Sequence, residues 1–341
     1  MKILLNGLYS FLIIMLLILF CCYDDLSTKP LLQWTFFIGW SVFNLFSISL
    51  YWSLMVYLLD KDRAKASFGY IAAGGSAGAI AGSALAGFVS HWGDTSFLLL
   101  IGSALLFLFL YTQNKILYFS QTQEESKCFI KLKPYSFRYF WQPIRYIYQS
   151  SFLSSMAVSN FIYAIMNTFL YYEQLSLVEN FSQDYIEKTT LLALIATIIN
   201  TTTLIIQLFL FQKLIAHSRS NFLLTAVPLL TLLSFVCLIC QPSIILLILS
   251  ITIHRAGNYS IIKPLREIFY TNITKDAKFG AKNFADTIFS RGGDLAGSWW
   301  CGLIAEGLGI KFLLISVIPL GIWWFQNSRK LANYDFYLHS K

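Results

Sequence analysis

Charged residues are scarce in this chain. Only 12% of its 341 residues are Asp, Glu, Lys or Arg, whereas about 25% is usual for soluble domains. The mean hydropathy is +0.62, and apolar runs of about 20 residues recur along the sequence, which is the length that crosses a bilayer as one helix. The shortage of charge therefore excludes an ordinary soluble domain and predicts an all-α polytopic membrane protein.

Residues that usually hold metals or perform catalysis are also few. The four histidines are scattered, and the six cysteines fall mostly inside apolar runs without ligand spacing (Cys21, Cys22, Cys128, Cys237, Cys240 and Cys301). The sequence holds no H-E-x-x-H motif, no Walker loop and no Ser, His and Asp pattern typical of a hydrolase. We therefore expect no metal site, no disulfide framework, no cofactor and no enzymatic activity.

Acidic residues are outnumbered, since 17 Asp and Glu face 25 Lys and Arg. An excess of basic residues is typical of nucleic-acid binding when it covers one soluble face. Here the basic residues lie between apolar runs, so nucleic acid is not an expected partner.

The apolar runs predict about ten transmembrane helices, approximately at Ile3–Tyr23, Leu31–Leu59, Phe68–Val89, Ser96–Tyr118, Ser151–Tyr172, Leu191–Gln212, Phe222–Cys240, Ser243–Pro264, Asn283–Ala305 and Lys311–Phe325.

The basic residues also predict the orientation of the chain. If the N-terminus is cytoplasmic, 20 of the 25 Lys and Arg residues lie on the inner side, three on the outer side and two inside the membrane. Cytoplasmic loops of membrane proteins carry such an excess of Lys and Arg. We therefore expect both termini in the cytoplasm and a multi-pass protein in a bacterial inner membrane.

The longest polar connection divides four predicted spans from six. It predicts an incomplete N-terminal four-helix bundle at 1–118, a basic cytoplasmic linker at 119–150 and a C-terminal six-helix bundle at 151–341. The second half of the linker mixes aromatic residues with arginines, which is typical of a helix lying on an anionic membrane surface. A solvated linker with aromatic residues at the membrane boundary is the other interpretation.

The third predicted span is rich in small residues. Gly74, Gly78 and Gly82 recur every four residues and so share one helix face, where they predict close packing of a neighbouring helix.

The segment Lys61–Gly82 also resembles Lys275–Gly297, because each is a basic loop that enters a span with a Gly-Gly pair. Both copies would cross from inside to outside, which is typical of the parallel repeats of two-lobed transporters.

The eighth predicted span carries charges where they are costly. An ionisable side chain near the centre of a bilayer costs at least a few kcal/mol unless it is paired or solvated. At 100° per residue, Arg255, Asn258, Tyr259 and Lys263 fall within one stripe about 140° wide. This stripe predicts a face directed away from lipid.

The ninth predicted span has a similar face with Asp286, Arg291 and Asp294, beside Gly293 and Gly297. Arg255 and Asp294 are each roughly 17 to 18 Å from one end of their helices, close to the midplane. An ion pair between them is therefore expected, either as a link between two helices or as part of a cavity wall that attracts anions. The candidate substrate-path residues are Arg255, Asn258, Tyr259, Lys263, Asp286, Arg291, Asp294 and, from the second span, Asn44.

Four segments together resemble a known family. The sequences YWSLMVYLLDKDRAKASFGYIAAGGSAGAIAG, LIIQLFLFQKL, HRAGNYSIIKPLREIFY and KNFADTIFSRGGDLAG are similar to the bacterial major-facilitator-type carriers, in the branch distantly similar to the ATP/ADP translocases. The resemblance implies secondary active transport by alternating access between two helical bundles. It also implies a small anionic substrate, with nucleotides among the candidates, that binds between the two bundles.

The family has twelve spans in two sets of six, and this chain has four before the linker and six after it. Loss of the first helix pair would preserve the orientation, and we expect the chain to lack this pair. The alternative is a truncated paralogue that does not transport, or a membrane interaction subunit. The sequence makes no prediction of the oligomeric state.

Overall fold

The computed structural model describes residues 2–21, 30–59, 61–92, 96–123, 137–181, 185–217, 220–271, 281–308 and 310–339, and nearly all of them are helical. Their contacts divide the chain into two compact units. Unit 1 is Met1–Ser47 with Ala81–Ser136, and unit 2 is Ile48–Ile80 with Phe137–Lys341. Two long helices, α3 (Pro30–Leu58) and α4 (Lys61–Trp92), pass from one unit into the other.

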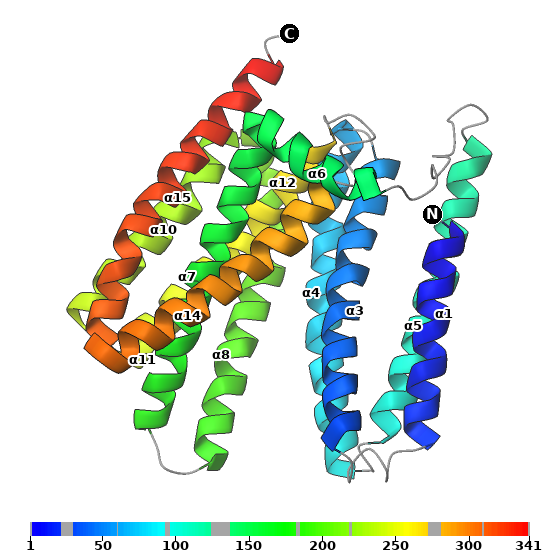
Figure 1. The fold of residues 1–341 in the computed structure, drawn as a ribbon, viewed down its shortest axis with the longest axis horizontal. Coiled ribbons are helices and arrows are strands. Elements are labelled where there is room, and N and C mark those ends of the chain that lie inside the picture. The colour runs from blue at the N-terminus through cyan, green and yellow to red at the C-terminus, as the bar shows by residue number, and fades with distance from the viewer. Residues whose placement is uncertain are drawn as a thin grey trace. The chain divides into compact units, whose positions relative to one another are not determined.

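Unit 1 is built around the pairing of α1 (Lys2–Cys21) with α5 (Phe97–Gln123), which run side by side in Figure 1. The fully buried ring of Tyr9 is central to this unit. Its centroid lies 5.7 Å from that of Phe43 on α3 and 5.2 Å from that of Phe109 on α5. Aromatic rings at these distances and inclined to one another attract beyond simple burial of surface, so this cluster holds the three helices together.

Unit 2 is organised around α7 (Ser151–Phe181), the most buried of the long apolar helices. Figure 1 shows α14 (Ser290–Leu308) and α15 (Ile310–His339) packed along α7, while α10 (Ser220–Cys240) packs on α15. The remaining helices of this unit are α6 (Phe137–Gln149), α8 (Tyr185–Ile205), α9 (Phe211–His217), α11 (Ile244–Gly257) and α12 (Lys263–Tyr270).

Three helices of unit 2 contain a π-helical turn. These turns are η1 (Ile206–Leu210) between α8 and α9, η2 (Asn258–Ile262) between α11 and α12, and η3 (Ala285–Phe289) before α14. A π-turn widens the helix and is found often at functional sites. The three turns lie in the same segments that carried the resemblance to transport proteins.

The close contact of α14 with α7 depends on two glycines. A Cβ atom added at Gly293 would lie 2.4 Å from the carbonyl oxygen of Phe161, and one added at Gly297 would lie 2.9 Å from Cβ of Thr168. Only a residue without a side chain allows the two backbones to approach so closely.

The glycines of α4 behave differently from the expectation. No described atom lies within 4 Å of the position of a Cβ atom at Gly74, Gly78 or Gly82, and all three are exposed. The close contact lies instead at Gly69, where a Cβ atom would be 2.5 Å from the ring of Phe211 on α9. A four-residue spacing of small residues permits close packing but does not supply the neighbour that uses it.

Six helices of the described segments are long and apolar enough to cross a membrane. They lie at Phe36–Val56, Phe97–Ile116, Ser151–Phe181, Thr190–Ala216, Phe222–Cys240 and Ile244–Tyr270. Each coincides with a predicted span, and α1, α4, α14 and α15 occupy the other four predicted positions. The chain is therefore an all-helical, multi-pass membrane protein. The small residues of α4 and the charges of α14 and α15 reduce the hydropathy of these helices.

The bundles expected at 1–118 and 151–341 stay a prediction. In the structure, residues 48–80 group with the C-terminal helices, as does α6. Polar contacts join these parts of α3 and α4 to the C-terminal helices. Ser49 and Ser53 donate hydrogen bonds to Oδ1 of Asn283 at 2.8 and 2.6 Å, and Ser76 donates to Oε1 of Gln207 at 2.7 Å.

Substitution of Gly293 by alanine tests the contact of α14 with α7. We expect Gly293→Ala to lower the free energy of unfolding by about 1–3 kcal/mol, because the new methyl group overlaps the backbone of Phe161. The measurement is the midpoint of thermal unfolding in detergent. Gly302→Ala on the same helix is the control, since nothing lies within 4 Å of its Cβ position. A Gly293→Ala protein that unfolds at the wild-type temperature would contradict the prediction.

Candidate functional site

The residues of the predicted polar stripe lie on the continuous helix formed by α11, η2 and α12. Ser243 caps its start by accepting a hydrogen bond from the amide of Leu246 at 3.3 Å. Pro264 lies just after the π-turn. Proline has no amide hydrogen. With the five-residue spacing of a π-turn, the carbonyl that Pro264 leaves without a hydrogen bond is that of Tyr259. This carbonyl accepts a hydrogen bond from Nε2 of Gln207 at 3.1 Å instead.

Gln207 therefore links three helices. It belongs to η1, its amide donates to the backbone of Tyr259 in η2, and its side-chain oxygen accepts from Ser76 of α4. The side chain is 2% exposed, so its polar atoms are satisfied by protein groups. In apolar surroundings such bonds between helices fix their relative positions.

Arg255 is held by a neutral partner. Its Nε donates a hydrogen bond of 2.8 Å to Oδ1 of Asn167 on α7. It forms no ion pair with a carboxylate in the part of the chain that the structure describes. The arginine is partly buried, and no described carboxylate compensates its positive charge in a region where charge is costly.

His254, the neighbour of Arg255, has a structural role. Its ring is fully buried and stacks on Tyr163 with centroids 4.5 Å apart and an angle of 15° between the planes. Nε2 lies 3.3 Å from the carbonyl oxygen of Tyr163, and Trp324 meets the ring edge-on at 5.6 Å. This packing fixes the rotation of α11 against α7 and α15.

Lys263 lies between two aromatic rings. Its Nζ is 5.7 Å from the ring centroid of Trp52 on α3 and 5.7 Å from that of Tyr259. A cation over an aromatic face is attracted by the electron density of the ring but keeps its charge. Lys263 lies within 4 Å of no carboxylate among the described residues, but Glu267 and Asp286 are near enough to attract it. Tyr259 is 45% exposed, whereas Asn258 is 4% exposed and lies close to the hydroxyl of Tyr163.

A second group of charges lies where α12 meets α7 and the helix that contains η3. We call this group, which consists of Asn160, Arg266, Glu267, Lys282 and Asp286, the ionic cluster. Lys282 Nζ is 3.1 Å from Glu267 Oε2 and 3.6 Å from Asp286 Oδ2. Arg266 Nη2 is 3.6 Å from Asp286 Oδ1. Asn160 on α7 donates to Asp286 at 2.9 Å and accepts from Arg266.

The ionic cluster is neutral and buried. Two cations face two carboxylates, and the side chains of Lys282 and Glu267 are 0% and 1% exposed. The predicted spans end at Pro264 and begin again at Asn283, so Glu267 and Lys282 fell outside them, and Asp286 was the predicted site residue of the cluster. The available signal was the four-residue spacing of Lys282 and Asp286, which puts them on one helix face.

The expected ion pair between Arg255 and Asp294 is not formed. Asp294 pairs with Arg291, three residues earlier on the same helix, at 3.2 Å. Both α11 and α14 pack against α7, and there Arg255 finds Asn167. Equal depth in the membrane therefore did not bring the two charges together. The side chains of Arg291 and Asp294 are 61% and 38% exposed, so this pair lies on the surface of unit 2.

Asn44, the remaining predicted residue, is exposed and belongs to unit 1. Arg255, Tyr259, Lys263 and Asp286 belong to unit 2 and lie on the polar sides of η2, η3 and their flanking helices. A role for Asn44 stays a prediction from the sequence.

The pair of Lys282 and Glu267 makes a direct test of the ionic cluster. We expect Lys282→Met to lower the free energy of unfolding by about 3–5 kcal/mol, because it leaves a buried carboxylate without its main partner. Glu267→Gln combined with Lys282→Met should cost less than the sum of the single changes. Unfolding midpoints in detergent measure both. Lys330→Met at an exposed position of α15 is the control, with an effect within about 0.5 kcal/mol. Additive effects of the two changes would contradict the coupling.

Comparison with known proteins gives a fold match. No family model and no curated protein sequence matches the chain. The crystal structure of the human organic anion transporter MFSD10 (TETRAN) superimposes with a TM-score of 0.64 and 14% sequence identity, covering 94% of this chain and 77% of that protein. No match supports the branch of the ATP/ADP translocases. The chain therefore shares its fold with this transporter.

Proposed function

We propose that this protein is a secondary active transporter that moves a small anion across the membrane by alternating access. The observation that carries the proposal is Arg255, a partly buried cation whose described side-chain partner is the amide of Asn167, on the same helix as Lys263. The shared fold with an anion transporter supports the same conclusion.

The contrast with the ionic cluster explains why these two cations would serve a substrate. Arg266 and Lys282 are neutralised by Glu267 and Asp286, so their charges are already used within the protein. Arg255 contacts an amide and Lys263 contacts aromatic faces. A charged group in a membrane needs a counter-charge or water. An anionic substrate would supply the counter-charge that no described residue gives Arg255.

The spacing of the two cations bears on the substrate. They are eight residues apart on a helix, which is about 12 Å along the axis at 1.5 Å per residue. A compact anion would contact one of them at a time, whereas a longer molecule with an aromatic part could reach both and meet Trp52 and Tyr259. Nucleotides, which the resemblance brought forward, satisfy this description, and so do other organic anions.

The π-turns supply the places at which the helices would change shape. η1 and η2 are joined by Gln207, and η3 carries Asp286 of the ionic cluster. A π-turn holds one extra residue in the helix. The turn can move along the helix with little loss of hydrogen bonding. We propose that these turns bend as the transporter opens to one side and then to the other.

Anion uptake into proteoliposomes tests the role of Arg255. We expect purified protein to take up at least one compound from a panel of nucleotides and organic phosphates. Arg255→Gln should reduce uptake at low substrate concentration about tenfold or more, because a hydrogen bond to a charged group contributes about 1.5–3 kcal/mol. Arg255→Lys should retain part of the activity.

The control for this measurement is Arg329→Gln, which removes an exposed arginine from α15. It should leave uptake unchanged. Equal uptake by wild type and Arg255→Gln at matched protein levels would remove Arg255 from the substrate path. A wild-type protein that is inserted and folded but transports none of the panel would favour an interaction subunit instead.

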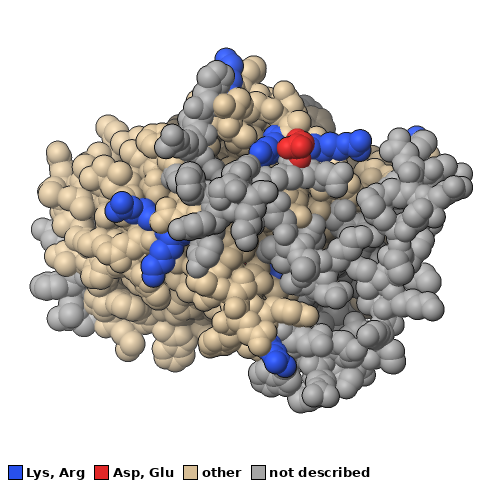
Figure 2. Space-filling view, turned by 90° about the horizontal axis from the view of Figure 1, so that it is seen from above, with Lys and Arg blue, Asp and Glu red and all other residues tan. Residues whose placement is uncertain are grey.

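We further propose ten spans, with both termini in the cytoplasm of a bacterial inner membrane. Figure 2 shows mostly Lys and Arg among the described charged residues on the face viewed from above, the end of unit 2 at which α6 lies in Figure 1. This distribution supports an inner side at that end.

A pair of cysteine substitutions tests this orientation. Gln149 ends α6 and Gln241 lies between α10 and α11, and both are exposed. In a protein freed of its own cysteines, Gln241→Cys should react with a membrane-impermeant maleimide added to intact cells. Gln149→Cys should react only after the membrane is permeabilised. The reverse pattern would overturn the orientation.

A further inference from the structure

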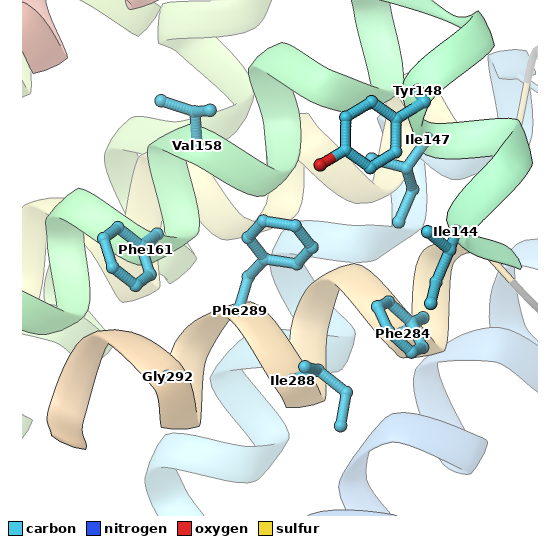
Figure 3. Close-up of a pocket in the computed structure, with 9 residues that line it drawn as sticks. All are labelled: Ile144, Ile147, Tyr148, Val158, Phe161, Phe284, Ile288, Phe289 and Gly292. Atoms are coloured by element: carbon cyan, nitrogen blue, oxygen red, sulfur yellow. The ribbon is translucent and has the colours of Figure 1, made fainter. Parts of the chain in front are cut away.

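The structure has an apolar cavity between α6, α7 and the helix that contains η3 and α14. Its volume is about 390 Å³, and its walls come from Ile144, Ile147, Tyr148, Val158, Phe161, Phe284, Ile288, Phe289 and Gly292. As Figure 3 shows, side chains from all three helices converge on one space. The hydroxyl of Tyr148 is the sole polar side-chain group among these nine residues, so the cavity suits an apolar occupant.

We propose that this cavity binds one acyl chain of an anionic phospholipid from the inner leaflet. The proposal rests on the membrane orientation given under the proposed function, but it does not depend on transport. The assignment to a lipid follows from the chemistry of the lining and from the position of α6.

The first argument is the two-sided character of α6. Ile144 and Ile147, three residues apart, both line the cavity, and Ile147 is 4% exposed where α6 packs on α7. Arg145 and Tyr146 are exposed on another side of the helix, whereas Tyr148 lines the cavity and is itself 85% exposed. A helix with an apolar and a basic aromatic side lies in the plane of a membrane surface. The cavity under such a helix is at the depth where acyl chains meet the headgroups.

The second argument is charge. The segment 119–149 that ends in α6 has five basic and two acidic residues (Lys127, Lys131, Lys133, Arg138 and Arg145 against Glu124 and Glu125). Basic residues next to a transmembrane helix attract anionic lipid headgroups. Arg145 lies beside the cavity wall in the sequence, so a headgroup at the cavity rim would meet a positive charge while its chain enters the apolar space.

The third argument is that the cavity is open on one side of unit 2. Ile288, on the wall, is 55% exposed, so an acyl chain can enter past it. Gly292 leaves space beside Phe161, because a Cβ atom there would be 3.7 Å from the ring, an ordinary contact distance. A larger side chain at this position would occupy the cavity without entering the backbone of α7.

The test uses the full chain in phosphatidylcholine vesicles that contain phosphatidylglycerol with a photoreactive acyl chain. After illumination, mass spectrometry of peptides should find labelling concentrated on α6 and on the 284–292 segment. Gly292→Leu should reduce labelling of these peptides at least about fivefold, because the added side chain competes for the cavity. Gly302→Leu on the same helix is the matched control, since its Cβ position has nothing within 4 Å, and it should label like the wild type.

Two additions make the outcome decisive. If Gly292→Leu fails to fold, Ile288→Trp fills the cavity from an exposed position. Photoreactive phosphatidylcholine and a photoreactive fatty acid, used separately, show whether the headgroup matters. We expect phosphatidylglycerol to label most strongly, and Arg145→Gln to abolish its advantage over phosphatidylcholine. Equal labelling by phosphatidylcholine in the wild type would overturn the assignment to an anionic lipid.

The same vesicles separate this proposal from the proposed function. Labelling that is spread evenly over all helices, or that Gly292→Leu leaves unchanged, overturns the lipid site while resistance to alkaline extraction still shows membrane insertion. Selective labelling in a protein that takes up no anion supports the lipid site and counts against transport.

Discussion

The cost of placing charge in an apolar medium governs the arrangement of unit 2. Five groups of the ionic cluster meet where α7, α12 and η3 come together, and each charge there has an opposite charge or an amide within reach. The two carboxylates and two cations would each be costly alone. Because they are held by three separate helices, their mutual neutralisation requires those helices to stay together. The cluster therefore specifies which helices are neighbours as much as it stabilises them.

Small residues have a complementary effect on the same helices. Gly293 and Gly297 let α14 approach α7 until backbone and side chains touch, and this brings η3 with Asp286 close to Asn160. The glycines of α4 carry no such contact in the described structure. Their exposed face lies on a helix that passes from unit 2 into unit 1. A glycine-rich helix face thus acts as a close contact only where a partner helix with a matching surface lies opposite.

Much of the fold follows from the sequence, and the reasons for the remainder are physical. The apolar runs predicted the positions of the helices because burial of backbone polar groups forces helix formation in a bilayer. The ends of the helices were less predictable. The span predicted at Ser243–Pro264 continues to Tyr270, because Arg266 and Glu267 find partners that only the folded chain supplies. Helical periodicity placed Arg255 and Lys263 on one polar stripe, but it held no information about which helices would face that stripe. Hence Asn167 was missed as the partner of Arg255, and Asp294 was expected in its place. Of the three π-turns, η2 has a visible cause in Pro264, whereas no proline accompanies η1 or η3.

The polar stripe of α11 and α12 is divided at η2 into two parts with different electrostatics. Beyond the turn, the charges of α12 are balanced by protein groups and would resist separation of the helices. Before the turn, Arg255 keeps a charge that no described carboxylate balances and that a bound anion would balance. A substrate that neutralises Arg255 would thereby change the balance of forces on the helix next to the ionic cluster. Because the π-turn lies between the two parts and its Tyr259 carbonyl is tied to η1 through Gln207, a change of shape at η2 reaches α8 and α4 directly. Anion binding at Arg255 and the contact between helices at the ionic cluster are therefore linked through the single helix formed by α11, η2 and α12.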